Sequence, residues 1–429
     1  MNFLPRARRS GMAESAQMQT SLKHALQVCV AVGVAAVPMI AAAFMQHGGG
    51  PARVAVYASV GEELITFSAD TERATLTKQS SIMLPGFVQE AWVSPSGPFL
   101  YVAWSNGGAS YNGSGVNPVG DQHGIAVFRV DAKGALHAHG APAAIRSRPI
   151  HITGDRSARH LLVAYNDPSG ISVHAINTDG TVGAEVPQSG SLDVGIYAHN
   201  VRVLPSNDAV VLVTRGNEPT NATKEDPGAL KVFRFENGKL TNAASIAPSN
   251  GIGFRSRHID FHPTRPWAFL TIEAQNRLEV FGIAKGTLTP QALFTKATLA
   301  DGTGVKSGQT ASTLHVHPNG QFVYVANRGA AEGGTNNIAV FRINQKTGEP
   351  SLIQNIDTHG LTPRTFSVDP SGHMLVVGNQ TTQPVAGNTV PANLAVFRIR
   401  TDGMLDFAQR YDLAVGRKPL WWTGLVPLK

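Results

Sequence analysis

The sequence predicts an all-β protein, a seven-bladed β-propeller whose blades are four-stranded antiparallel sheets. Two short motifs recur along the chain with one shared period, and the composition favours turns. Of the 429 residues, 44 are glycine and 26 are proline, whereas only 15% are charged. This composition argues against a long helical bundle or a coiled coil.

Residues 1–46 are predicted to be a leader that is not part of the fold. A basic stretch precedes an apolar run at 28–45, which includes the small-residue segment 41–43. This order is typical of a secretory signal, so we expect export to the periplasm or the medium. An uncleaved membrane anchor stays open because 18 apolar residues lie near the lower limit for a span. Gly33 and Pro38 inside the apolar run favour cleavage. A third interpretation is that the start of the protein is mis-assigned.

Two motifs repeat between residues 51 and 429. One is a Pro-containing turn followed by strand residues, as in 94–103, 317–326 and 369–378. The other is a β-rich segment that ends in Val-Phe or a near variant. Its seven copies are 64–67, 125–128, 171–174, 230–233, 278–281, 338–341 and 394–397. Repeats of about 40–60 residues with this turn pattern are typical of propeller blades, and seven copies predict seven blades.

Each repeat predicts strands A to D in order. A Pro/Gly turn joins A to B, a loop leads to the Val-Phe strand C, and a Gly turn precedes D. The terminal segment 418–424 resembles strand A or B. We expect it to complete the blade begun by 54–67, because an open sheet edge invites pairing. Residues 51–429 are therefore predicted to be a single domain, and we expect a monomer.

Strands A and B form a hairpin, so A strands begin and B strands end at one face of the ring, here called the mouth. Three arginines that converge there on one glutamate would be costly unless an anion or a hydrogen-bond network satisfied them. This pattern predicts a site for an anionic small molecule. The positions at A-strand starts are Gln89, Pro149 beside Arg148, His199, Arg257, Ser312 and Arg364. Those at B-strand ends are Ser105, Asn166, Arg215, Glu273, Arg328 and Gln380.

Other candidate residues point to structural roles. His315 and His317 share a strand face and could chelate a metal, but His317 belongs to a turn, so we expect no metal site. His258 alternates with Arg257 and is expected in the sheet packing, with support of the mouth as an alternative. Trp421 and Trp422 are expected to pack within a blade.

Composition and motifs also limit cofactors and partners. One cysteine in the whole chain excludes a disulfide framework and a cysteine-based zinc site. The net charge of +7, part of which lies in the leader, is too mild and too scattered for nucleic-acid binding. The chain lacks a P-loop, a dinucleotide fingerprint and a Gly-x-Ser-x-Gly elbow, and we expect no cofactor.

Four stretches carry a family resemblance: 256–263, 315–328 with 338–341, 362–372 and 378–380. They resemble the seven-bladed propeller lactonases, which include 6-phosphogluconolactonases and fungal carboxy-muconate lactonizing enzymes. The resemblance covers most of the chain from about residue 52. It implies that His199, Arg257, Glu273 and Arg328 carry the chemistry, and the strand register selects the same four residues.

We therefore expect a lactone hydrolase that acts on a small anionic sugar or carboxy lactone at the mouth. Glu273 or His199 would activate water, and two arginines, Arg257 and Arg328, would hold the oxyanion and a substrate carboxylate. The residues expected to bind the rest of the substrate are Arg364, Gln380, Asn200 and Asn327.

Two alternatives stay open, a cycloisomerisation at the same residues and a non-catalytic exported propeller that binds a ligand or a protein. Export also argues against 6-phosphogluconolactone as the substrate, because phosphorylated sugar lactones are cytosolic.

Overall fold

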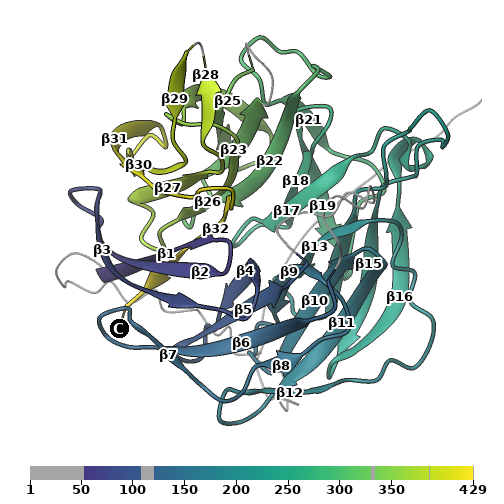
Figure 1. Cartoon of the computed structure of the whole chain (residues 1–429). Coiled ribbons are helices and arrows are strands. Elements are labelled where there is room, and N and C mark those ends of the chain that lie inside the picture. Colours follow the sequence, from purple (N-terminus) through teal and green to yellow (C-terminus); the bar gives the residue numbers. More distant parts are fainter. Residues whose placement is uncertain (1–52, 108–119, 330–333, 386, 429) are drawn as a thin grey trace, which may run out of the picture. The chain divides into compact units, whose positions relative to one another are not determined.

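Seven antiparallel sheets follow one another along the described part of the chain in the computed structural model (Figure 1). The structure describes residues 53–107, 120–329, 334–385 and 387–428, so the leader predicted at 1–46 lies outside the described residues. The chain divides into the units 1–48 and 49–429, and the described residues all belong to the second. They contain no helix long and apolar enough to cross a membrane.

Each of these seven sheets holds strands A to D in that radial order, and the prediction of seven four-stranded blades is confirmed. The first three blades are β32 (Leu420–Pro427), β1 (Arg53–Val60), β2 (Glu63–Asp70) and β3 (Thr75–Met83); β4 (Phe87–Val93), β5 (Phe99–Ser105), β6 (His123–Val130) and β7 (Leu136–Ala138), with β8 (Ala143–Ala144); and β9 (Pro149–Gly154), β10 (His160–Asn166), β11 (Ser169–Ile176) and β12 (Val182–Glu185).

The fourth and fifth blades are β13 (Ala198–Val203), β14 (Ala209–Thr214), β15 (Ala229–Glu236) and β16 (Lys239–Ile246); and β17 (Ser256–Phe261), β18 (Trp267–Ile272), β19 (Arg277–Ala284) and β20 (Thr287–Leu288), with β21 (Phe294–Ala297). The sixth and seventh are β22 (Gln309–Val316), β23 (Phe322–Gly329), β24 (Asn337–Ile343) and β25 (Pro350–Asp357); and β26 (Pro363–Val368), β27 (Met374–Asn379), β30 (Asn393–Ile399) and β31 (Leu405–Asp412). The short hairpin β28 (Gln383–Val385) and β29 (Asn388–Val390) and the 3-10 turn η1 (Pro248–Gly251) lie between blade strands.

The two inner strands of each blade form because their residues suit a sheet that is buried on both faces. β14 and β18 are rich in β-branched and aromatic residues and are buried along their whole length. The outermost strands, such as β3 and β16, are polar and mostly exposed. The core therefore lies between the faces of neighbouring blades, where side chains from the fourth and fifth blades share one apolar cluster.

The ring closes through its last strand. Each A strand contacts the A strands of the blades on either side, so β32, β4, β9, β13, β17, β22 and β26 surround a central channel in that order. β32 pairs with β1, which begins near the opposite end of the chain, and supplies strand A of the first blade. The prediction that 418–424 completes the blade of 54–67 is confirmed.

Several A strands carry an irregularity near their start. The pairing register shifts at His199 in β13, across Arg257 and His258 in β17, and at Arg364 in β26. A bulge inserts one extra residue and turns its side chain out of the regular alternation. These bulges therefore redirect three of the A-strand positions that the sequence assigned to the mouth, His199, Arg257 and Arg364.

Candidate active site

A cavity of about 1000 Å³ opens where A strands begin and B strands end. Its walls include His199, Arg257, Glu273, Arg328 and Arg364. The fourth to seventh blades supply them, as the strand register predicted. Residues as far apart in sequence as His199 and Arg364 thus share one opening.

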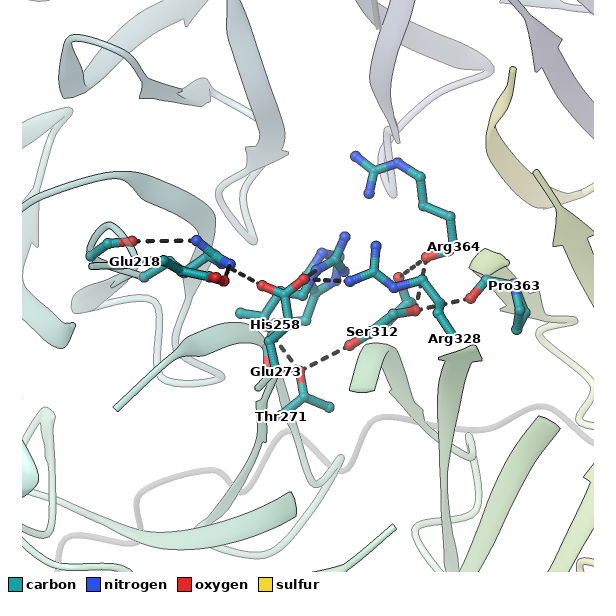
Figure 2. Close-up of polar contacts among 12 residues, drawn as sticks. Glu218, His258, Thr271, Glu273, Ser312, Arg328, Pro363 and Arg364 are labelled. Atoms are coloured by element: carbon teal, nitrogen blue, oxygen red, sulfur yellow. Dashed lines mark hydrogen bonds and ion pairs between the residues drawn. The ribbon is translucent and has the colours of Figure 1, made fainter. Parts of the chain in front are cut away.

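Glu273, the residue directly after β18, lies at the centre of a cluster of ion pairs (Figure 2). Arg215 donates from Nε to Oε2 of Glu273 at 2.5 Å, and Arg328 donates from Nη2 to Oε1. Nε of Arg257 lies 3.4 Å from the same Oε1. The Glu273 side chain is only 10% exposed, so three guanidinium groups neutralise one buried carboxylate.

The arginines determine the ionisation of Glu273. Burial by itself raises the pKa of its carboxyl group, but the charges of Arg215, Arg328 and Arg257 outweigh this effect. They hold the pKa well below its usual value of 4.5, so Glu273 is ionised at neutral pH.

His199 stands at the bulge of β13 and lines the same cavity. Burial first, and then the charge of Arg257, lowers the pKa of its imidazole well below 6.5, so the ring is neutral at pH 7. Its Nδ1 is buried and has no hydrogen-bond partner among the described residues. The ring centroid of His258 lies 5.3 Å from that of His199, so His258 supports the mouth as well as the strand packing.

Several buried guanidinium donors have no protein acceptor in the described part of the chain. They include Nη1 of Arg257, Nε of Arg328 and Nε of Arg364, which all belong to residues that line the cavity. A buried donor without an acceptor costs about 1–3 kcal/mol, and more where the group is charged. An anion in the cavity would supply the missing acceptors.

Trp421 lies beneath one of these groups. The Arg364 guanidinium carbon is 3.6 Å from the centroid of the Trp421 ring, a cation–π contact. Trp421 also lines the cavity, so the prediction that it only packs within a blade is wrong. Trp422 does belong to an apolar core cluster.

Comparison with known proteins agrees with this fold. A family model described as lactonase, 7-bladed beta-propeller, matches residues 52–393. The chain belongs to this family. The resemblance seen in the sequence is thereby confirmed, and a lactone hydrolase is the enzyme class that these matches support.

Individual relatives of this lactonase-family chain are distant. A 6-phosphogluconolactonase of Yersinia pestis (strain Pestoides F) is 29% identical over 351 residues, which cover 81% of this chain and 90% of that protein. A Lactobacillus plantarum protein shares the fold with a TM-score of 0.66 and 22% identity, over 88% of this chain and 99% of that one. The Pseudomonas aeruginosa periplasmic gluconolactonase shares the fold as well, with a TM-score of 0.63 and 18% identity. The match covers 88% of this chain and 100% of that one.

Three residues expected to bind substrate do not line the cavity. Asn200 follows His199 in its strand, and Asn327 precedes Arg328. Because successive side chains of a strand point to opposite faces, both asparagines point away from the cavity. Asn200 lines the central channel, and Asn327 is fully buried, where Thr298 donates to its Oδ1 at 2.6 Å. The Gln380 carbonyl accepts the backbone N–H of Leu420 at 3.0 Å, a contact that links two blades.

Arg215 and Arg148 line the cavity although neither was chosen as a site residue. Sequence analysis had placed Arg148 beside an A-strand start and Arg215 at a B-strand end, so their positions in the repeat could have identified them. The loop after β14 also contributes, through Asn217, Glu218 and Asp226. Nothing in the repeat predicts these loop residues, because loops between strands B and C share no motif from blade to blade.

The histidines considered as metal ligands are held by neighbouring groups. Nε2 of His317 lies 2.9 Å from the Gly372 carbonyl, and Nδ1 accepts the backbone N–H of Asn319 at 3.1 Å. Nδ1 of His315 lies 3.8 Å from an oxygen of Asp260. His317 therefore ties the turn of one blade to that of the next.

Proposed function

We propose that this protein hydrolyses a small anionic sugar or carboxy lactone in the cavity at the mouth. One observation carries the proposal: a neutral imidazole, a buried ionised carboxylate and guanidinium groups with free donors face one cavity. These are the groups that ester hydrolysis needs, a base for water and positive donors for an oxyanion.

His199 is the better candidate for the base. Both Glu273 oxygens already accept from arginines, and the pKa of Glu273 lies far below neutral, so its affinity for a proton is low. Glu273 instead keeps Arg215, Arg257 and Arg328 in place and offsets their charge.

The reaction follows from this division of roles. A water molecule attacks the lactone carbonyl carbon while His199 accepts one of its protons. Arg257 donates hydrogen bonds to the oxyanion that forms. The bond from this carbon to the ring oxygen then breaks, and the imidazolium returns the proton to the leaving alkoxide. The product is a hydroxy acid.

An anionic substrate would also change the pKa of His199, the proposed base. Arg257 lowers the pKa of His199, and a substrate anion beside Arg257 would offset that charge. The pKa of His199 would then rise towards neutrality in the complex, where a general base is most effective.

We propose further that the protein is exported and acts as a monomer on an unphosphorylated lactone. The leader supports export, and one structure that shares the fold is named a periplasmic gluconolactonase. Protein recovered from its native host should begin near Phe44. An intact Met1 on a cytosolic form would refute export.

The test of hydrolysis is a pH-stat assay of the purified protein with neutral, carboxylated and phosphorylated lactones. The wild type should open at least one class of lactone, and His199→Gln should lower the turnover by about 10²–10⁴-fold. A folded wild type that opens none of them would overturn the proposal and favour a non-catalytic binding protein. An open-chain unsaturated acid with the same mass as the lactone, formed without addition of water, would favour cycloisomerisation run in reverse.

A further inference from the structure

Three histidine rings form a row from the cavity into the central channel. His199 lines the cavity, whereas His258 and His151 line the channel behind it. The ring centroid of His258 lies 5.3 Å from that of His199 and 6.2 Å from that of His151. The rings come from the neighbouring A strands β13, β17 and β9, and β13 contacts both of the others (Figure 1). His258 therefore connects the candidate active site to the channel.

Buried nitrogens in this row have no protein partner. Nδ1 of His199 and Nδ1 of His151 are buried, and neither has a hydrogen-bond partner among the described residues. Leaving such atoms unpaired is costly, so water is the expected partner. The channel has a volume of about 170 Å³. Several water molecules fit there, because roughly 10–15 Å³ of cavity admits one, and they would join the rings into one hydrogen-bonded chain.

The channel reaches solvent at the face opposite the mouth. A strands begin at the mouth, so residues late in these strands lie near the other face. Asp260 stands two residues after His258 in β17, and Arg202 donates to its carboxylate at 2.5 Å. Nδ1 of His315 lies 3.8 Å from the same carboxylate. The side chains of Arg202 and His315 line the channel, and each is 32% exposed.

Each hydrolysis leaves one proton in the cavity. A lactone and water give a hydroxy acid, and its carboxyl group ionises at neutral pH. His199, the neutral base of the cavity, accepts the proton, so a turnover ends with an imidazolium. This imidazolium must lose its proton before His199 can activate water again.

Arginines disfavour a proton inside the cavity. Burial first, and then the charge of Arg257, lowers the pKa of His199. Arg364 and Arg215 act in the same direction, and Glu273 opposes them. The proton therefore leaves His199 readily, and the guanidinium charges resist its passage through the mouth.

The channel contains groups that can pass a proton on. Burial holds the pKa of His258 well below 6.5, so this ring is neutral and does not retain a proton. The charged and titratable groups that act with burial are Arg257, His199, His151 and Arg364. Burial likewise lowers the pKa of His151 to about 3, with contributions from Arg202 and His315. Glu90 also lines the channel, and burial raises its pKa to about 7 although Arg364 opposes this.

We infer, on the basis of the proposed hydrolysis, that His258 and His151 carry the proton of each turnover from His199 into the central channel. The bond between this proton and a nitrogen of His199 breaks while a bond to a nitrogen of His258 forms, directly or through one water molecule. His258 releases the proton of its other nitrogen towards His151, and water carries it to the opposite face. The mouth then serves only substrate and product.

The test separates a proton relay from a structural role of His258. His258→Phe keeps an aromatic ring beside His199 but removes both nitrogens. At low buffer concentration kcat should fall by at least about fivefold, whereas kcat/KM should change by less than about twofold. The reason is that kcat/KM covers only the steps up to the opening of the lactone, and the proton leaves later. An equal fall in kcat and kcat/KM would mean that His258 only positions His199, and would overturn the relay.

Chemical rescue gives a second measurement. In His258→Ala, added imidazole should restore most of the lost kcat, because it can occupy the vacated space and titrates near neutral pH. A loss that imidazole does not restore, or wild-type kcat in both variants, would overturn the relay while hydrolysis itself stands. A wild type that opens no lactone in the same assay would instead refute the proposed hydrolysis, and the relay with it.

His151→Phe tests the next carrier. The variant that combines it with His258→Phe should lose at most about twofold more kcat than the more affected single variant, because one missing carrier already interrupts the route. Losses that multiply would indicate two independent structural effects and would overturn the relay.

His174→Phe is the matched control. His174 is 4% exposed, its Nε2 lies 2.9 Å from Oγ of Ser172, and it lines neither the cavity nor the channel. Its kcat should stay within about twofold of the wild type. Circular dichroism should show a native fold for every variant compared.

Discussion

At the scale of single residues, the site depends on one carboxylate that serves three arginines. Removing one partner from a buried ionic cluster leaves the other charges uncompensated, and this penalty exceeds the net stabilisation that the intact ion pairs provide. Glu273 therefore contributes to both stability and activity, although it does not touch the proton that moves. The sequence predicted that three arginines converge on Glu273 at the mouth. The structure shows that the ones in contact with it are Arg215, Arg257 and Arg328.

Glu273→Gln should lower kcat/KM by roughly 10²–10³-fold, because glutamine offers its neighbours one acceptor and no charge. Steady-state kinetics with the best lactone, alongside circular dichroism, provides the measurement. Glu218→Gln is the matched control, since Glu218 pairs with the same Arg215 at 2.5 Å but is 61% exposed. Its loss should stay within a few-fold, as for a surface ion pair. Full activity of Glu273→Gln would contradict the role assigned to Glu273.

The pH profile should test whether the charge of the substrate is coupled to the ionisation of His199. Burial and Arg257 lower the pKa of free His199, so kcat/KM should stay constant from about pH 8 to below pH 6.5. The proposed anionic substrate would raise this pKa in the complex, so the acidic limb of kcat should lie at higher pH than that of kcat/KM. Both limbs follow from initial rates measured across the range. Coincident limbs would argue against coupling between the substrate charge and His199.

At the scale of elements, the repeat predicted which strands carry the site, and the bulges explain where that prediction stopped. The polarity of the A–B hairpins placed A-strand starts at the mouth, and His199, Arg257 and Arg364 are there. Asn200 and Asn327 are neighbours of lining residues, and alternation turns them away from the cavity. Bulges have no side-chain signature of their own, so a single sequence does not reveal which residue is redirected.

Ring closure by β32 gives a prediction about stability. Leu420 is fully buried in a cluster that joins the first and seventh blades. Leu420→Ala should reduce the free energy of unfolding by about 2–5 kcal/mol, because it opens a cavity at the closing seam. Leu352→Ala, at a leucine that is 38% exposed in β25, should cost less than about 1 kcal/mol. Urea unfolding of both variants measures the difference, and equal losses would mean that the seam is no more tightly packed than the surface.

At the scale of the whole molecule, the seven A strands enclose a polar channel behind the site. Its walls include Glu90, His151 and His258, which come from three different blades. Blade number and strand order could be predicted from the sequence because two motifs shared one period. The contents of the channel could not, because the facing residues lie more than 40 positions apart and follow no repeat.

Glu90 makes this channel a source of pH-dependent stability. Burial raises the pKa of Glu90 to about 7, despite opposing contributions from the Ala91 backbone N–H and from Arg364. Below about pH 4.5 both the folded and the unfolded chain hold this proton, whereas between pH 4.5 and about 7 only the folded chain does. The contribution of Glu90 to stability is therefore complete below about pH 4.5 and is lost as the pH rises through 7.

Glu90→Gln should isolate this contribution, because glutamine can still accept the Ala91 N–H that Glu90 Oε1 accepts at 3.2 Å. Relative to the wild type, the variant should gain free energy of unfolding between about pH 5 and pH 8, by roughly 3 kcal/mol at the upper end. Histidines and other groups that titrate equally in both proteins contribute equally to the two free energies of unfolding, so their contributions cancel in the difference. Urea unfolding at several pH values measures the difference. A constant difference across this range would mean that Glu90 is already ionised in the folded channel, with Arg364 as its counter-ion rather than a group available to bind substrate.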